Sequence, residues 1–232
     1  HLGNHHYLHV VDNTLPQLID ELRRYGIERN IVFANSGISS DEVYGNDLVA
    51  AAYRQYPEQF IPFATANLHR PPSEVRRELE RCFALGMRGI KLHPGFQGYD
   101  PNSDVVEGPC AFAHERKAFI LNHYWGSVQR VLDLCRRYPD ACFITGHTDT
   151  DVLAVAHSVE NLYVGSCPTW DFGVVERIYH MGGADRFLFS TDLSWGSIGW
   201  GIGPILYARM PMEAKRLILG GNLRRLLQQY GH

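Results

Sequence analysis

The sequence predicts a (β/α)8 barrel made of a single domain over residues 1–232, and three observations lead to this prediction. Short apolar runs of roughly five to seven residues alternate with amphipathic helical stretches. Seven such runs are visible, and an eighth strand, truncated, is implied at the start. This alternation indicates a parallel sheet with helical crossovers, and seven or eight units favour a closed barrel. The rival, an open doubly wound sheet, usually carries a Gly-rich phosphate loop, but neither GxGxxG nor GxxxxGK[ST] occurs.

The seven expected strands are apolar almost throughout, as strands of a parallel sheet buried on both faces are. They are expected over residues 30–34, 60–65, 89–93, 119–123, 141–147, 162–166 and 186–192. In the last of them, alternation places Leu188, Ser190 and Asp192 on one face. That face therefore changes from apolar to ionisable as the strand ends.

The helices between the strands are expected from apolar stripes bounded by capping residues. They are expected over residues 14–26, 41–56, 73–86, 110–117, 127–135, 151–159, 172–180 and 212–230. Thr14 is expected to act as an N-cap, with Gln17 closing a capping box, and Ser73 and Ser127 as further N-caps. Loops are expected over residues 95–108 and 193–204.

Composition limits the class of protein. Hydrophobic residues make up 45% and charged residues 20%, and the net charge is -3 without a long run of one sign. Nothing therefore suggests a nucleic-acid partner or an anionic membrane surface. No signal peptide and no apolar run of about 18 residues is present, so no membrane span is expected. The five cysteines are scattered, odd in number and without CxxC spacing, which favours reduced thiols in a cytoplasmic protein.

The ends of the strands carry the residues that indicate chemistry. Lys91 and His93, then His123, His147 and Asp192 occupy these ends. In a barrel, such positions converge on the C-terminal face, where the active sites of this fold lie. A lone histidine at a strand end is more often a hydrogen-bonded rim residue, but two histidines and an aspartate at matching ends favour a metal site. A metal would also compensate the charge of Asp192, which is costly if buried alone.

Several stretches together resemble one known family. They are Gly89–Pro94 with Phe96–Gly98, Ile120–His123, Ile144–His147, Asn161–Val164, Phe187–Asp192 with Trp195, and Leu219–Leu226. Their order and spacing are similar to those of the amidohydrolase superfamily, specifically its amidohydrolase-related, metal-dependent hydrolases with a (β/α)8 barrel. The resemblance runs from about Leu15 to the end of the chain.

The resemblance implies a set of roles. His123 and Asp192 would be metal ligands, and His147 would be a ligand or an acid/base residue. His1 is similar to the second histidine of a first-strand His-x-His pair, so it is expected to be a fourth ligand. Lys91 would either be carboxylated and bridge two metals or contact the substrate. The cofactor is expected to be one or two divalent ions, zinc before manganese or another ion.

The expected reaction is metal-assisted hydrolysis of an amide, lactone or ester bond in a small, anionic substrate. Asp192 would accept the proton of the attacking water, and His147 would orient that water or stabilise the developing oxyanion. Lys91 and His93 would anchor the anionic part of the substrate. The aromatic loops that contain Trp125 and Trp195 would form apolar walls, although their rings suit loop packing or a homo-oligomer interface equally well.

Two alternatives remain open at this point. Related branches of the family use the same residues to decarboxylate or hydrate unsaturated or aromatic acids, so a lyase is the second hypothesis. A barrel that has lost catalysis and acts as a binding scaffold is the third. Specificity in this fold lies in the loops, and the substrate therefore cannot be read from these motifs.

Overall fold

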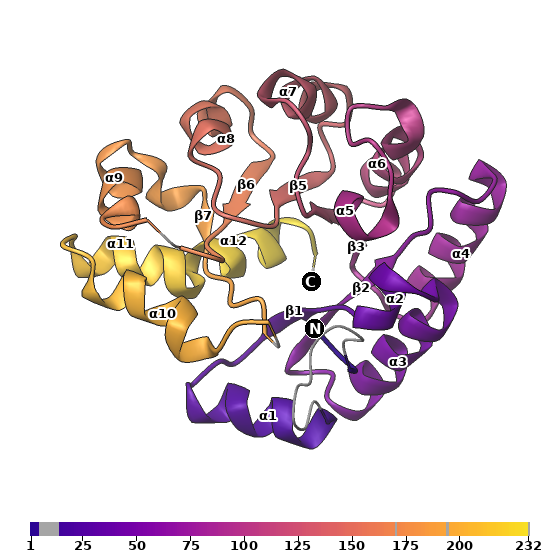
Figure 1. Cartoon of the computed structure of the whole chain (residues 1–232), viewed down its shortest axis with the longest axis horizontal. Helices are drawn as coiled ribbons and strands as arrows, with labels where there is room; N and C mark the ends of the chain where they lie inside the picture. Colours follow the sequence, from indigo (N-terminus) through magenta and orange to yellow (C-terminus); the bar gives the residue numbers. More distant parts are fainter. Residues whose placement is uncertain (5–13, 170, 194, 232) are drawn as a thin grey trace.

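Seven parallel strands run side by side in chain order and form a curled sheet (Figure 1). The computed structural model describes residues 1–4, 14–169, 171–193 and 195–231. Its strands are β1 (Asn30–Val32), β2 (Phe60–Thr65), β3 (Gly89–Leu92), β4 (Phe119–Asn122), β5 (Cys142–Thr145), β6 (Leu162–Gly165) and β7 (Phe187–Leu188). Each strand pairs in parallel with the next. The predicted architecture, a (β/α)8 barrel with a truncated first strand, is therefore confirmed, with seven strands among the described residues.

Most of the helices cover the outer face of the sheet, and the inner faces of the strands converge on one centre (Figure 1). The longer helices are α1 (Leu15–Arg24), α3 (Glu42–Gln55), α4 (Pro72–Ala84), α6 (Glu107–Glu115), α7 (Val128–Arg137), α9 (Val174–His180), α10 (Ile198–Tyr207) and α12 (Asn222–Gln229). The shorter ones are α2 (Asn35–Ser39), α5 (Pro94–Gln97), α8 (Thr150–Val155) and α11 (Met212–Arg216), with single turns η1 (Asp104–Val106), η2 (Ala156–Ser158), η3 (Gly183–Asp185) and η4 (Leu217–Gly221).

The first residues of the chain lie where the sheet would need an eighth strand. Leu2 forms a parallel bridge with Ala34, its amide donates to the carbonyl of Phe33 at 2.8 Å, and its carbonyl accepts from the amide of Asn35 at 2.9 Å. On its other side, the ring of His1 lies against Asp192, four residues beyond β7. Residues 1 and 2 therefore connect the two outer strands of the sheet at their carboxyl ends.

The core has two layers, one on each face of the sheet. The inner layer contains the inward side chains of the strands and the apolar face of α12, which covers the amino end of the barrel. Its members are Phe33, Ile61, Phe63, Phe119, Cys142, Ile144, Tyr163, Leu188, Leu226 and Leu227. The outer layer lies between the sheet and the helices and includes Ile90, Ile120, Phe143 and Trp125. Burial on both faces explains why the strands read as continuous apolar runs.

The helix ends agree only in part with the expectations. Ser127 accepts a hydrogen bond from the amide of Arg130 at 3.1 Å and caps α7 as predicted. The predicted capping box at Thr14 is wrong, because this side chain makes no capping hydrogen bond. The prediction for Ser73 is also wrong, because α4 begins at Pro72 after Pro71.

Three segments differ from the expected loops and helices. The expected loop over residues 95–108 contains most of α5 and all of η1. The expected loop before Pro204 is largely helix α10, which includes this proline. The single helix expected over residues 212–230 is divided into α11, η4 and α12. Glycines and a proline inside these segments obscured the helical pattern.

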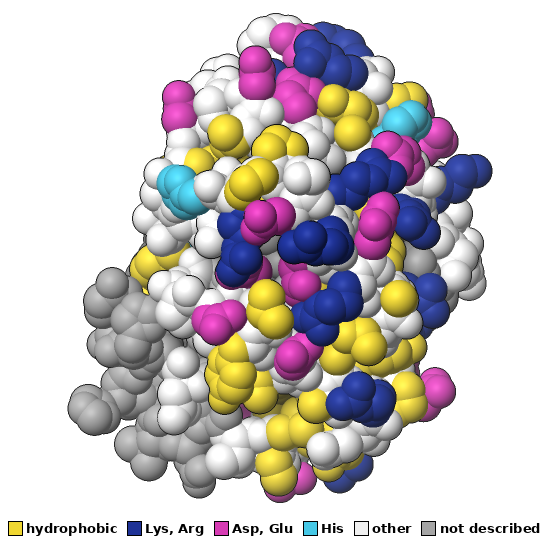
Figure 2. Space-filling view, turned by 90° about the vertical axis from the view of Figure 1, so that its right-hand side faces the viewer, with side chains coloured by type: hydrophobic (Ala, Val, Ile, Leu, Met, Phe, Trp, Pro, Cys, Tyr) yellow, Lys and Arg dark blue, Asp and Glu magenta, His cyan; other side chains and the backbone are white. Residues whose placement is uncertain are grey.

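Charged side chains of both signs alternate on the face that carries α4 (Figure 2). Arg76 on α4 pairs with Glu115 on α6 at 2.7 Å, and Arg81 pairs with Asp47 on α3 at 2.7 Å. These pairs connect neighbouring helices across the outside of the barrel and leave no patch of one sign on that face. No described helix is both long and apolar enough to cross a bilayer.

Candidate active site

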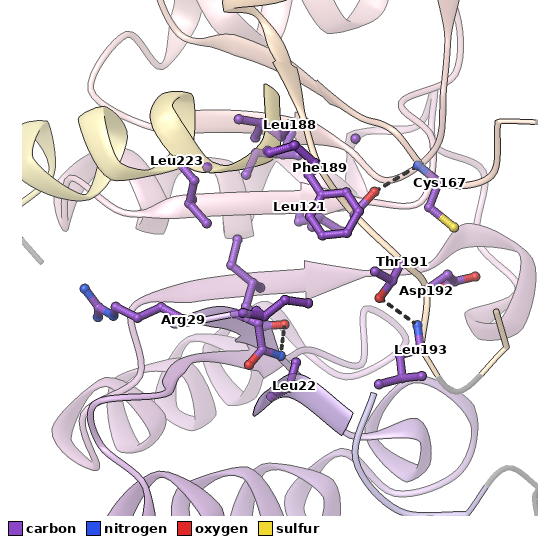
Figure 3. Close-up of a pocket in the computed structure, with 18 of the residues that line it drawn as sticks. Leu22, Arg29, Leu121, Cys167, Leu188, Phe189, Thr191, Asp192, Leu193 and Leu223 are labelled. Atoms are coloured by element: carbon purple, nitrogen blue, oxygen red, sulfur yellow. Dashed lines mark hydrogen bonds between the residues drawn. The ribbon is translucent and has the colours of Figure 1, made fainter. Parts of the chain in front are cut away.

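A cavity of about 680 Å³ brings together four of the predicted site residues: His1, Lys91, His147 and Asp192. They lie at the carboxyl ends of the strands, as the fold predicts. The cavity continues along the inner face of the sheet between apolar side chains. Figure 3 shows Asp192 and Cys167 at one end of the cavity and Arg29 at the other, with Leu121 and Leu188 between them.

Asp192 lies in the loop after β7 and contacts His1. The Nε2 atom of His1 is 2.9 Å from Oδ1 of Asp192. Asp192 has a φ of 50°, a left-handed backbone conformation, and its carbonyl accepts from the amides of Trp195 at 2.7 Å and Gly196 at 3.0 Å. Burial raises the pKa of this carboxyl, but the hydrogen bond and electrostatic attraction to His1, with smaller contributions from His147 and Lys91, outweigh it. The pKa of Asp192 therefore lies well below its ordinary value, and the group is a carboxylate.

His123 and His147 form a second pair. Nε2 of His147 is 2.9 Å from Nδ1 of His123, and the two ring centroids are 4.0 Å apart. Burial, then His147 and Lys91, lower the pKa of His123 to about 3. Burial also lowers the pKa of His147, and the carboxylate of Asp192 opposes this effect on both rings. Both imidazoles are therefore neutral at pH 7.

A row of contacting rings supports this second pair. The ring of His93 stacks on His123 at 3.9 Å and is tilted against Phe96 at 4.3 Å, and Phe96 in turn stacks on Trp195 at 6.0 Å. Nδ1 of His93 accepts from the amide of Phe96 at 3.1 Å, and the amide of His93 donates to the side chain of Gln97 at 2.8 Å. Burial, Lys91 and His123 lower the pKa of His93 to about 2. This neutral ring therefore backs His123 rather than carrying a charge.

Lys91 supplies a positive charge to the wall of the cavity. Its side chain comes from β3 and is 3% exposed, and its Nζ lies 4.9 Å from the ring centroid of Phe33. Burial lowers the pKa of Lys91 to about 8, and the carboxylate of Asp192 opposes that effect. The amine is thus still protonated at pH 7. A buried ammonium of this kind suits an anionic ligand.

Two of the predicted residues reach the site by a different route from strict strand alternation. Asn122 pairs with Thr145 in the sheet, so the position in register with His123 is Gly146 and not His147. The chain turns at Gly146, where a Cβ atom would lie 3.2 Å from Cα of His123. Asp192 is likewise outside its strand, because β7 ends at Leu188. The prediction that both residues continue the alternation of their strands is therefore wrong, although both side chains line the cavity.

The two tryptophans predicted to contact the substrate differ. Trp195 is 39% exposed and stacks on Phe96 at the carboxyl end of the barrel. Trp125 is 2% exposed, donates its indole N–H to the carbonyl of Ile144 at 3.0 Å and packs on Phe143 in the outer core layer. The structure therefore places Trp125 behind the sheet, away from the cavity, because an apolar ring after a strand is equally able to pack under the next helix.

Four residues at or beside the site were missed: Phe33, Asn35, Phe96 and Cys167. Nδ1 of His1 is 2.6 Å from Oδ1 of Asn35, and the ring of Phe33 contacts His1 edge-on at 4.4 Å. Cys167 follows β6, lines the cavity and is 4% exposed. Asn35 follows a strand just as His123 does, and this position was the one signal that pointed to it.

The donor atoms fit a divalent ion by their chemistry. Imidazole nitrogens and a carboxylate oxygen are the ligands that zinc and manganese accept, and metal binding needs neutral rings such as His123 and His147. In the described part of the chain, however, no group of three or more His, Cys, Asp or Glu side chains surrounds one point. The donors instead face one another in two pairs, His1 with Asp192 and His123 with His147.

Comparison with known families identifies the family of this chain. The sequence profile described as amidohydrolase matches residues 13–229, which is most of the chain. The chain belongs to the amidohydrolase family. The predicted resemblance is thus confirmed, and with it membership of a family of enzymes. No curated protein matches the sequence.

Solved structures show the same amidohydrolase fold. An uncharacterised TIM-barrel protein from Bordetella bronchiseptica has a TM-score of 0.77 at 20% identity, over 95% of this chain and 84% of the other. 4-Oxalomesaconate hydratase from Rhodopseudomonas palustris has a TM-score of 0.70 at 15% identity, over 94% and 82%. A 5-carboxyvanillate decarboxylase from Novosphingobium aromaticivorans, solved with bound manganese, has a TM-score of 0.72 at 14% identity, over 91% and 80%. At these identities the likeness shows the fold alone.

Proposed function

We propose that this amidohydrolase-family protein is a metal-dependent hydrolase of a small, anionic substrate with an amide, lactone or ester bond. One observation carries the proposal: a single cavity contains a buried ammonium, Lys91, beside the carboxylate of Asp192 and the neutral imidazole of His147. The combination offers an anion-binding group and a proton acceptor within one partly apolar space. The five free, buried cysteines support a reducing compartment such as the cytoplasm.

The residues proposed to hold the metal are His1, His123, His147 and Asp192. A divalent ion, zinc before manganese, would supply Lewis acidity that polarises a carbonyl and lowers the pKa of water. The side chains are already close to one another in two pairs, each with a donor separation of 2.9 Å. The manganese bound to a decarboxylase of the same fold supports a divalent ion at this place.

The other steps are carried out by side chains of this protein. Asp192, which is a carboxylate, would accept the proton of the attacking water and return it to the leaving group. His147 can donate a hydrogen bond to the oxyanion as it develops. Lys91 attracts the anionic part of the substrate, and Trp195 forms part of the rim above it. Phe33 and Leu121 form part of the apolar wall of the cavity.

A lyase is the second candidate, and specific observations favour it. The structural neighbours include two kinds of lyase, a hydratase and several decarboxylases. Lys91 and the donor pairs would serve decarboxylation or hydration of an unsaturated or aromatic acid as well, because such substrates also bring a carboxylate into the cavity.

Product analysis in ¹⁸O-labelled water tests the proposal. The purified protein, loaded with zinc or manganese, is incubated with a panel of lactones, amides and esters that carry a carboxylate, and with aromatic and unsaturated acids. A hydrolase incorporates one ¹⁸O atom while a scissile bond is lost. Release of CO2 with no ¹⁸O in the organic product, or addition of ¹⁸O-water across a double bond, overturns the hydrolase proposal in favour of the lyase.

Metal analysis separates both enzymes from a binding scaffold. Elemental analysis of the protein is expected to find one or two equivalents of a divalent ion, and two equivalents would give Lys91 the bridging role of a carboxylated lysine. Substoichiometric metal, with no turnover after zinc or manganese is added, overturns both catalytic proposals.

A further inference from the structure

We propose that Asn35 is a positioning residue that fixes the orientation and the tautomer of the His1 ring. The proposal deepens the metal site proposed above and rests on it for its functional meaning. Asn35 is the first residue of helix α2, directly after β1, and its side chain is fully buried. A fully buried amide must satisfy its donors and acceptors within the protein, so its orientation is defined.

The hydrogen-bond partners of Asn35 define which end of its amide faces His1. Its Nδ2 donates to the carbonyl of Gly3 at 2.8 Å. Since a carbonyl only accepts, the nitrogen of the amide must be on that side, and Oδ1 must be on the side of His1. Oδ1 lies 2.6 Å from Nδ1 of His1. An amide oxygen only accepts, and Nδ1 therefore carries a proton and donates it.

A proton on Nδ1 leaves Nε2 as the nitrogen that would bind a metal. In the metal-free protein Nε2 lies 2.9 Å from Oδ1 of Asp192. A carboxylate oxygen only accepts, so Nε2 donates to it, and a bound ion would replace that proton. The edge-on contact with Phe33 at 4.4 Å holds the plane of the ring. Hydrogen bonds from the second ring nitrogen to a protein acceptor set the tautomer and orientation of metal-binding histidines in general.

The backbone of Asn35 connects the same residue to the chain that carries His1. Its amide donates to the carbonyl of Leu2 at 2.9 Å, and its carbonyl accepts from the hydroxyl of Ser39 at 2.7 Å. Asn35 thus holds residues 1–3 through three contacts: the His1 ring, the Leu2 carbonyl and the Gly3 carbonyl. An aspartate would keep an acceptor for Nδ1 of His1 but would place a second oxygen against the carbonyl of Gly3.

The test uses ¹⁵N-histidine NMR of the metal-free protein and metal titration. At about pH 9, where free imidazole is neutral, the wild-type His1 ring is expected to keep a proton on Nδ1. Its signals are assigned by their loss in His1→Gln. Asn35→Ala removes the acceptor of Nδ1 and is expected to leave the proton on Nε2, against Asp192, whereas Asn35→Asp is expected to keep Nδ1 protonated.

Metal affinity is the second measurement. Asn35→Ala is expected to weaken zinc binding by about 10- to 100-fold, the usual effect of removing the hydrogen-bond partner of a ligand histidine. Asn161→Ala is the matched control: Asn161 is also buried, but its side chain donates to the carbonyls of Cys135, Tyr138 and Ala141. This control is expected to lose stability without a change in the His1 tautomer.

The outcomes separate this proposal from the proposed function. A wild-type His1 ring with a bare Nδ1 overturns the role of Asn35, whether or not any variant folds. An Asn35→Ala variant that keeps the wild-type tautomer and zinc affinity overturns that role as well. A wild-type protein that shows the expected tautomer but binds no metal overturns the proposed function while leaving the positioning role of Asn35 intact.

Discussion

Replacing Lys91 with methionine is expected to stabilise the protein while it removes the anion-binding charge. The two side chains are similar in length, so packing changes little. Burial lowers the pKa of Lys91 from 10.5 to about 8, which means that the protonated amine is less favourable in the folded protein than in water. At about 1.4 kcal/mol per pH unit, this penalty is about 3 kcal/mol at pH 7.

Part of this penalty is offset by the contact between the Lys91 ammonium and the face of Phe33, which is worth about 1 kcal/mol. The expected net gain for Lys91→Met is therefore about 2 kcal/mol at pH 7, or roughly 4–8 °C in Tm for a chain of this size. Above pH 8 the folded protein loses the proton before the unfolded chain does. The penalty accordingly fades as pH rises towards 10.5, and the gain is expected to fall below about 1 kcal/mol at pH 10.

The assay is urea unfolding of metal-free wild type and Lys91→Met at pH 7 and pH 10. Other groups titrate in both proteins, and their effects cancel in the difference. Lys117→Met, at an exposed lysine, is the matched control and is expected to change the free energy of unfolding by no more than about 0.5 kcal/mol. A Lys91→Met variant that is less stable than wild type at pH 7, or a gain that does not shrink by pH 10, refutes the reasoning.

Three further predictions concern the site and the core around it. Asp192→Asn is expected to lower kcat by at least about 100-fold, the usual share of a proton-transfer group, without unfolding the protein; steady-state assays with circular dichroism check this. The free energy of unfolding of the metal-free protein is expected to fall as pH drops below 6.5. In the unfolded chain His93 and His123 bind protons near that pH, whereas in the folded protein their pKa values are lowered to about 2 and about 3. Trp125→Leu is expected to cost about 3 kcal/mol of stability, and Trp195→Leu to raise KM with little change in stability.

Each of these has an outcome that contradicts it. For the aspartate, the control is Asp104→Asn at a carboxylate that is 95% exposed, and equal losses in both variants would point to a general charge effect. For the histidines, the free energy of unfolding, measured with urea between pH 7.5 and 4.5, should change by up to about 1.4 kcal/mol per pH unit for each ring. A free energy that does not change with pH argues against burial of neutral imidazoles. A Trp125→Leu variant as stable as wild type would show that the Trp125 ring contributes little to the stability of the core.

Much of the barrel can be predicted from the sequence because parallel strands are buried on both faces. The apolar runs over β2 and β4, for example, are continuous, and periodicity finds them without any knowledge of contacts. Helix α10 was not predicted because its glycines and Pro204 are typical of a loop. The apolar packing of this helix forms only in the folded protein. Propensity is a weak guide where tertiary packing decides.

The site residues show the same division. His147 and Asp192 were expected at strand ends, but their strands stop early and turns deliver them to the cavity, which alternation cannot predict. The prediction that Trp125 lies in the site failed because the sequence does not show on which side of its loop a ring packs. That side depends on the neighbouring structure, here Phe143. Asn35 was missed because its partner, His1, lies 34 residues away in the chain.

The left-handed backbone at Asp192 limits which amino acids position 192 can accept over evolutionary time. Asn and Gly tolerate this conformation, whereas branched or longer side chains are strained in it. Position 192 therefore has two requirements, one set by the turn and one by the charge, and aspartate meets both. A complete set of substitutions at this position would separate them: Asn and Gly would retain the fold and lose the chemistry, and Glu would retain the charge but strain the turn.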